Sequence, residues 1–180
     1  MIRVMLYLSS IIIANIIAAH FPPLKIWIFN IPWGTFFIGA TFIFRDLVQN
    51  KFGRKKTYGF IALALVLSAF SSFALGDTLM IVFASALSFL VSESTDTEIY
   101  TRLKLPMAWR VFYSGIAGGF LDSVVFVIIG LSPLGANFIP WEAVPAAIIG
   151  QVFVKTVLQS AGALVLSRLL RRPVLREAIM

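Results

Sequence analysis

Six long apolar segments separated by short loops constrain this sequence more than any other feature. Each is close to the roughly 20 residues that an α-helix needs to cross the hydrocarbon core of a bilayer. The first segment could pass for a signal peptide, but five others follow and Asn15 interrupts it, so we expect it to be retained. Glycine and proline occupy the breaks. The pattern predicts an all-α polytopic membrane protein, one transmembrane domain over residues 1–180, with six helices near 4–20, 33–50, 58–76, 78–95, 110–131 and 144–169.

Composition agrees with a membrane protein and excludes several classes of site. Hydrophobic residues make up 59% of the chain and charged residues 13%, against about 45–50% and 25% in soluble domains. There is no cysteine and one histidine, His20, which excludes disulfides, thiolate metal sites and multi-histidine metal sites. Metalloprotease, serine hydrolase and P-loop motifs are missing from the sequence. We therefore expect neither an enzyme nor a bound cofactor or metal.

The basic residues indicate how the chain is oriented. The net charge is +7, yet Lys and Arg lie between the apolar segments, a pattern of membrane proteins rather than of nucleic-acid-binding ones. Lys25 stands alone on one side, where Trp27, Trp33 and Trp141 are also expected. We therefore expect the N-terminus and C-terminus in the cytoplasm, together with Arg3, Arg45, Lys51, Arg54, Lys55, Lys56, Arg102, Lys104, Arg110, Arg168, Arg171, Arg172 and Arg176.

Polar residues at four-residue spacing mark single faces of three helices. An ionisable group at mid-membrane depth costs about 2.5–3.5 kcal/mol on insertion scales, which makes it a functional candidate. Asp122 lies ~18 Å and Lys155 ~20 Å from the cytoplasmic ends of their helices at 1.5 Å per residue. We therefore expect an ion pair or a shared polar cavity near the midplane. The faces are Ala84, Ser88, Ser92 and Asp96 with Glu93 beside them; Arg110, Ser114, Gly118 and Asp122; and Gln151, Lys155 and Gln159.

Structural roles remain open for the same residues. Small side chains at this spacing are a common means of helix packing in lipid, and a buried Asp–Lys pair can be a clamp. Arg45, Glu93 and Arg110 can extend to the inner interface. Polar faces on several helices, with Asn15 at mid-depth in the first, nevertheless favour a substrate cavity.

Several motifs in order along the chain resemble those of the queuosine precursor transporters, a family also described as vitamin uptake transporters. Trp33-Gly34 opens the second helix. Residues 44–53 (FRDLVQNKFG) are similar to an Asp-Leu-x-x-x-x-Phe/Tyr-Gly signature, and residues 92–103 (SESTDTEIYTRL) to a second signature with Asp, Phe/Tyr and Arg-Leu. Residues 118–126, which contain Asp122-Ser123, resemble a third, and Val154-Lys155 a fourth. The match is looser at Gly119, where relatives can carry a polar side chain.

The resemblance implies a six-spanning transporter without its own ATPase, which imports a 7-deazaguanine such as 7-cyano-7-deazaguanine through a bacterial inner membrane for queuosine synthesis and tRNA modification. A carboxylate can accept hydrogen bonds from N1–H and the exocyclic amine of such a base, and an amide or ammonium group can donate to O6 or to a nitrile. Aromatic side chains can stack on the flat ring. Expected partners are this small molecule and membrane lipid, with no nucleic acid. The expected substrate-binding residues are Asp122, Lys155, Asn15, Gln151, Glu93 and Trp33, and the expected gate or helix tie comprises Arg45, Asp46, Asp96 and Arg110.

Other functions remain open at this point. The chain is also compatible with a substrate-binding subunit of an energy-coupling-factor vitamin transporter, docked through Ala14-x-x-x-Ala18, although this pattern is common in helix packing. An intramembrane enzyme would use Asp46 or Asp96, and a scaffold would leave the midplane charges without a role. The driving force and the association of copies of the chain are not determined by the sequence.

Overall fold

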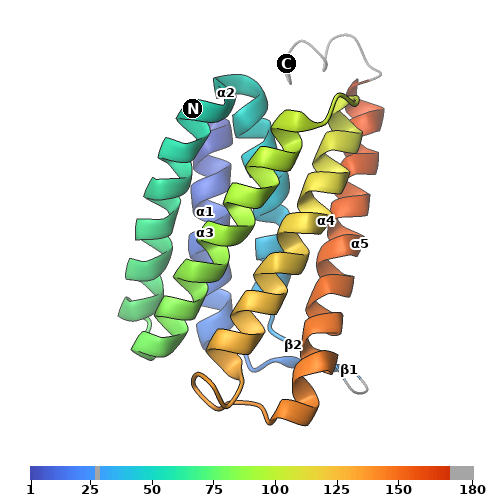
Figure 1. Ribbon diagram of the computed structural model, residues 1–180. Coiled ribbons are helices and arrows are strands. Elements are labelled where there is room, and N and C mark those ends of the chain that lie inside the picture. Colours follow the sequence, from blue (N-terminus) through green and yellow to red (C-terminus); the bar gives the residue numbers. More distant parts are fainter. Residues whose placement is uncertain (27–28, 171–180) are drawn as a thin grey trace.

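The computed structural model describes residues 1–26 and 29–170, and these form a bundle of long helices (Figure 1). A two-stranded antiparallel sheet, β1 (Leu24–Ile26) and β2 (Phe29–Ile31), follows the first helix. A π-helical turn, η1 (Val127–Leu131), extends the fourth helix, and a 3-10 turn, η2 (Trp141–Ala143), precedes the fifth. The all-α membrane class is confirmed. The helices are α1 (Ile2–His20), α2 (Gly34–Ala74), α3 (Leu79–Arg102), α4 (Met107–Phe126) and α5 (Val144–Leu170).

The described chain has five helices that are long and apolar enough to cross a membrane, whereas six were predicted. The difference lies in α2, which contains 41 residues and would be ~60 Å long if straight, twice the ~30 Å hydrocarbon thickness. It is not straight, because Gly53 has φ 78° and ψ 167°, which is not helical. Figure 1 shows α2 reversing its direction at one end of the bundle. The predicted second and third helices are therefore the two halves of α2.

Contacts with α1 confirm that α2 crosses the bundle twice. Arg3 Nη1 donates a hydrogen bond to the Leu47 carbonyl over 3.1 Å. At the other end of α1, Asn15 Nδ2 donates to the Ser68 carbonyl over 3.0 Å, and a Cβ on Gly34 would lie 3.0 Å from the Ala14 carbonyl. Residues 34 and 68 therefore lie at the same level, and residue 47 lies at the opposite one.

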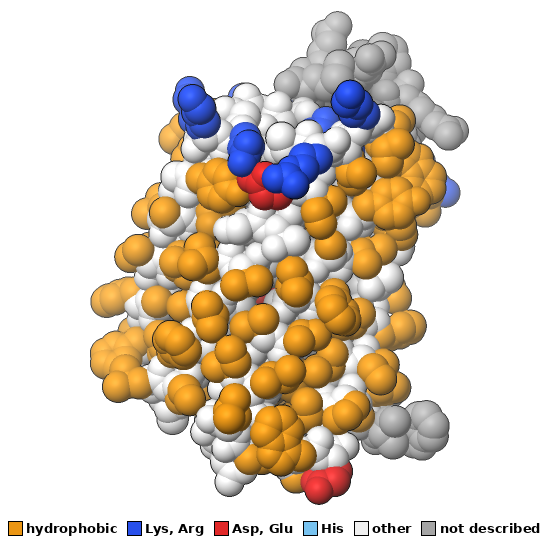
Figure 2. All heavy atoms as spheres, viewed as in Figure 1, with side chains coloured by type: hydrophobic (Ala, Val, Ile, Leu, Met, Phe, Trp, Pro, Cys, Tyr) orange, Lys and Arg blue, Asp and Glu red, His pale blue; other side chains and the backbone are white. Residues whose placement is uncertain are grey.

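The surface of the bundle is apolar along its length and basic at one end. Large hydrophobic side chains are exposed on several helices, including Phe70, Phe83 and Phe153, and Figure 2 shows hydrophobic side chains along the face in view, with Lys and Arg at one end. Lipid is the solvent that suits such a surface. We call the end with Lys and Arg the basic end. Trp27, Arg171, Arg172 and Arg176 lie outside the described residues.

Candidate functional site

Asp122 of α4 and Lys155 of α5 form the buried ion pair that their depth predicts. Lys155 Nζ lies 2.6 Å from Asp122 Oδ2 and also donates to Ser123 Oγ over 2.8 Å. The exposed fraction is 4% for the Lys155 side chain and 13% for that of Asp122. The two charges cancel, so the pair brings no net charge into the membrane. Removing one partner would leave a buried charge unpaired, at a cost of about 3–5 kcal/mol.

This pair lines a narrow cavity of about 100 Å³ between the helices. All five helices contribute to its wall, so that its shape depends on how the whole bundle packs. Polar and aromatic groups share the wall, a mixture typical of small-molecule sites. Besides the ion pair, the lining residues include Asn15, Thr35, Ser68, Ser85, Ser88, Phe89, Phe126 and Gln151.

A wide cavity of about 430 Å³ adjoins the narrow one. The two share Asn15, Ser85 and Phe126 in their walls. The wide cavity adds Asp77 and Phe138, from the connections between helices at the end opposite the basic end. Its volume falls in the range of about 300–1,000 Å³ for ligand pockets. The ion pair therefore lies beneath a hollow in the half of the bundle away from the basic end.

Gln151 presents an unused donor to the narrow cavity. Its side chain is 2% exposed, and Nε2 makes no hydrogen bond within the described residues. An unpaired buried donor costs about 1–3 kcal/mol and is rare in native proteins, so a ligand that accepts this hydrogen bond would remove a penalty. Asn15 differs, because Nδ2 donates to the Ser68 carbonyl and to Ser71 Oγ, which holds its amide in the cavity wall.

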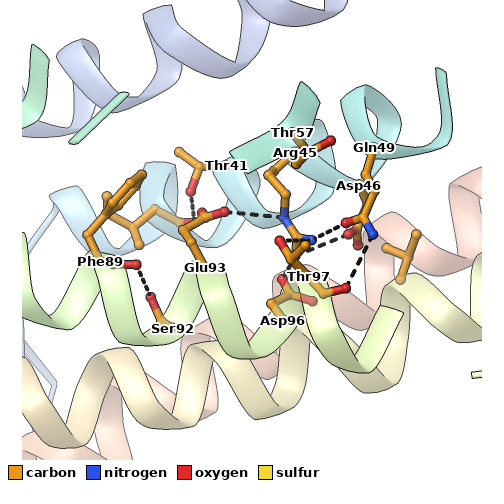
Figure 3. Close-up of polar contacts among 12 residues, drawn as sticks. Thr41, Arg45, Asp46, Gln49, Thr57, Phe89, Ser92, Glu93, Asp96 and Thr97 are labelled. Atoms are coloured by element: carbon orange, nitrogen blue, oxygen red, sulfur yellow. Dashed lines mark hydrogen bonds and ion pairs between the residues drawn. The ribbon is translucent and has the colours of Figure 1, made fainter. Parts of the chain in front are cut away.

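Three carboxylates surround one buried arginine on the basic side of the narrow cavity (Figure 3). Arg45 Nη2 lies 3.1 Å from Asp46 Oδ1 and also contacts Asp96 Oδ2, and Arg45 Nε lies 3.2 Å from Glu93 Oε2. All four side chains are at most 1% exposed. We call these residues the ion cluster. Its contacts join α2 to α3, as do hydrogen bonds from Arg45 to Thr97 and from Gln49 to Thr101.

The remaining predicted residues lie outside the cavity walls. Glu93 belongs to the ion cluster. Trp33, 39% exposed, lies at the start of α2 against Phe36. Arg110 Nε donates to the Tyr100 carbonyl over 3.0 Å, and its guanidinium lies 3.9 Å from the centre of the Tyr100 ring. Arg45, Asp46 and Asp96 thus lie together in the ion cluster, while Arg110 contacts Tyr100 at the corner between α3 and α4.

The sequence did not single out the aromatic part of the site. Phe89 and Phe126 line the narrow cavity, but phenylalanine is abundant in this chain, so no charge or spacing separates these two from phenylalanines that face lipid. Tyr7, which is fully buried and faces Glu93, was also missed. A tyrosine hydroxyl four residues after Arg3 in the first helix was the available signal.

The family described as "Putative vitamin uptake transporter" matches residues 68–168, more than half of the chain. The matched stretch includes Glu93, Asp96, Asp122, Gln151 and Lys155. No curated protein and no solved structure matches the chain. The chain belongs to the vitamin uptake transporter family, and it is a multi-pass membrane protein.

Proposed function

We propose that this protein imports a queuosine precursor, 7-cyano-7-deazaguanine or a related 7-deazaguanine, through the bacterial inner membrane. The proposal is supported chiefly by one observation: an unpaired donor, Gln151 Nε2, and a carboxylate acceptor, Asp122, line the same buried cavity. Membership of an uptake transporter family supports transport as the activity, and the choice of substrate rests on the chemistry of the cavity and on the motifs described above.

The charges of the cavity favour a neutral substrate. Asp122 and Lys155 neutralise each other over 2.6 Å, so a charged ligand would bring an uncompensated charge into the membrane interior, which is costly. 7-Cyano-7-deazaguanine is neutral, flat and polar at its edge. Asp122 can accept hydrogen bonds from N1–H and the exocyclic amine, and Gln151 can donate to O6 or to the nitrile. Phe89 and Phe126 offer faces for the ring.

The unequal ends of the bundle favour entry from outside the cell. The wide cavity lies in the half away from the basic end, and the positive-inside rule assigns that half to the outside. On the cytoplasmic side, the ion cluster fills the space between α2 and α3 with fully buried side chains. This arrangement corresponds to an outward-facing state, with the substrate site in the narrow cavity that adjoins the wide one.

Uptake of labelled 7-cyano-7-deazaguanine into a host unable to make queuosine precursors tests the proposal. We expect the wild-type protein to restore uptake, unlabelled 7-deazaguanines to compete, and guanine and vitamins to compete weakly, because a mismatched edge leaves buried polar groups unpaired. Asp122→Asn should abolish uptake while the protein still reaches the membrane.

Glu142→Gln is the matched control, because it removes an exposed carboxylate in η2, outside both cavity walls. It should transport at the wild-type rate. Normal uptake by Asp122→Asn would remove the assigned site, and competition by a vitamin in preference to 7-deazaguanines would overturn the choice of substrate.

A further inference from the structure

The charges of the ion cluster do not balance. Arg45 contributes one positive charge, which an arginine does not lose in a protein. Asp46, Glu93 and Asp96 would contribute three negative charges if all were ionised. With every side chain at most 1% exposed, water cannot stabilise the excess, and buried carboxyl groups in this position are held neutral by protons or paired with cations.

The neighbouring cation, Arg110 of α4, does not remove the excess. It is an electrostatic neighbour of Asp46, but its guanidinium lies against the Tyr100 ring. Even if Arg110 balanced Asp46 completely, Glu93 and Asp96 would share Arg45, and one negative charge would remain. Lys155 of α5 is engaged by Asp122. The charged and titratable neighbours of Glu93 include Tyr7, Arg45, Asp46, Asp96 and Asp122. Tyr100 and Arg110 are neighbours of Asp46.

Buried hydroxyl groups around the cluster have hydrogen-bonding capacity to spare. Tyr7 of α1 faces Glu93, Ser114 of α4 faces Asp96, and Tyr100 is an electrostatic neighbour of Asp46. The three residues are fully buried, and none of their hydroxyl oxygens has a hydrogen bond of regular geometry within the described residues. A hydroxyl can accept from a carboxylic acid or donate to a carboxylate. The surroundings of the cluster therefore suit both protonation states.

Glu93 is the member of the cluster nearest to the cavity along α3. Phe89, one turn away, lines the narrow cavity, so Glu93 lies ~6 Å further toward the basic end at 1.5 Å per residue. Asp122, which lines the same cavity, is among the electrostatic neighbours of Glu93. A proton entering through the cavities would therefore meet Glu93 before Asp46 at the basic side of the cluster.

We propose that the ion cluster is a proton-binding site, with Glu93 as its exchangeable carboxyl group, and that its proton is carried inward together with the substrate. Glu93 forms an O–H bond with a proton from water outside, and it returns that proton to cytoplasmic water when the basic end opens. No electrons are exchanged. α2 and α3 then close against each other through Arg45, and Glu93 takes up its next proton from water outside. This inference rests on the proposed function for the identity of the co-transported molecule.

Transport into proteoliposomes of purified protein tests the coupling, with labelled 7-cyano-7-deazaguanine as the probe. A gradient of about one pH unit, acid outside, supports about tenfold accumulation of a neutral substrate per coupled proton. We expect the wild-type protein to accumulate the probe under this gradient and only to equilibrate it without one. Glu93→Gln, which cannot exchange a proton, should lose the accumulation and still equilibrate the probe.

Glu98→Gln is the matched control on the same helix. Glu98 lies outside the cluster, 24% exposed, and pairs with Arg54 and Arg102 at the basic end. The Glu98→Gln variant should accumulate the probe under the pH gradient as the wild-type protein does. Wild-type protein should also accumulate it when sodium is replaced by potassium. Accumulation that ignores the pH gradient, that needs sodium, or that persists in Glu93→Gln would overturn the proposal. Absence of any uptake, with or without a gradient, would instead contradict the proposed substrate.

Infrared spectroscopy of the protein without substrate provides a second readout. A protonated buried carboxyl group gives a carbonyl-stretch band separate from the carboxylate bands. We expect this band in wild-type protein and in Glu98→Gln at neutral pH, and a weaker band in Glu93→Gln, because one protonated carboxyl group is then missing. Absence of the band from wild-type protein would contradict a bound proton. A band of undiminished intensity in Glu93→Gln would remove Glu93 from the assigned role, whatever the substrate is.

Discussion

The polar residues inside this bundle fall into two groups that differ in how their charges are neutralised. Asp122 and Lys155 form a closed pair at the cavity, which can turn toward a neutral ligand without changing the net charge of the interior. The ion cluster around Arg45 carries more acid than base. The pair therefore suits recognition, and the cluster suits ion exchange.

Gln151 provides a prediction at the level of one hydrogen bond. Replacing it with methionine removes the donor that faces the narrow cavity, so binding of 7-cyano-7-deazaguanine should weaken about two- to tenfold, as expected for roughly 0.5–1.5 kcal/mol. The substrate-free protein should become slightly more stable, because an unpaired buried donor is gone. Titration of the purified variant and its thermal unfolding in detergent measure both effects.

Gln159→Met is the matched control for this substitution, since Gln159 lies on the same face of α5, two turns away from Gln151, and donates to the Val111 carbonyl. Gln159 belongs to neither cavity wall. The Gln159→Met variant should therefore bind 7-cyano-7-deazaguanine with the affinity of the wild-type protein. Equal loss of affinity in both variants would indicate a general effect of repacking α5 and not a contact with the substrate.

At this scale the sequence predicted positions along helices better than rotations about them. Asp122 and Lys155 were matched by depth alone, because the rise per residue of a helix is fixed. Glu93 was expected to bind substrate, but whether it faces the cavity or Arg45 depends on how α3 is turned against α2. That rotation depends on side-chain packing between distant segments, for which a single sequence carries little signal.

Among the elements, α2 differs most from the sequence-based prediction. The apolar pattern predicted two helices separated by the basic residues 51–56, and the chain is helical on both sides of Gly53 up to the reversal itself. A break in hydropathy marks where a chain leaves the membrane, but it does not show whether the connection is a loop or a single residue. The φ of 78° and ψ of 167° at Gly53 lie in a region that is essentially restricted to glycine.

Gly53 and Gly59 form a matched pair for testing this turn. Gly53→Ala forces a side chain into the glycine-only conformation and should destabilise the protein by about 1–3 kcal/mol, although a Cβ there would meet nothing within 4 Å. Gly59 lies within the second half of α2, where the backbone is helical, and a Cβ there would also meet nothing within 4 Å. Gly59→Ala should therefore be neutral or stabilising by up to about 1 kcal/mol. Thermal unfolding in detergent compares them. Similar stability of the two variants would mean that the reversal does not depend on the backbone of Gly53.

For the whole molecule, import through the wide cavity requires that the end opposite the basic end faces outward. The apolar surface and the single basic end (Figure 2) were predictable from composition and from the distribution of Lys and Arg. The cavities were not, because a hollow is a property of the packed bundle. The wide cavity lies in the half away from the basic end. If the basic end is cytoplasmic, the wide cavity therefore faces the side from which a substrate would be imported.

The lack of cysteine allows a direct test of orientation. Leu134, in the connection between α4 and α5, and Leu105, between α3 and α4, are both exposed and lie at opposite ends of the bundle. In intact cells, a membrane-impermeant thiol reagent should label Leu134→Cys and spare Leu105→Cys until the cells are permeabilised. The reverse pattern would place the wide cavity on the cytoplasmic side and would contradict import from an outward-facing state.

The central claim is that a neutral 7-deazaguanine binds in the narrow cavity beside Asp122, and equilibrium binding of 7-cyano-7-deazaguanine to the purified protein tests it most directly. The double variant Asp122→Asn/Lys155→Met keeps the interior neutral, which avoids the cost of an unpaired charge. It replaces the carboxylate, which can accept from N1–H and the exocyclic amine together, by an amide with a single acceptor oxygen. We predict saturable binding to wild-type protein and loss of binding in the double variant at unchanged thermal stability. Equal binding by both proteins, or no binding by the wild-type protein, would contradict the account.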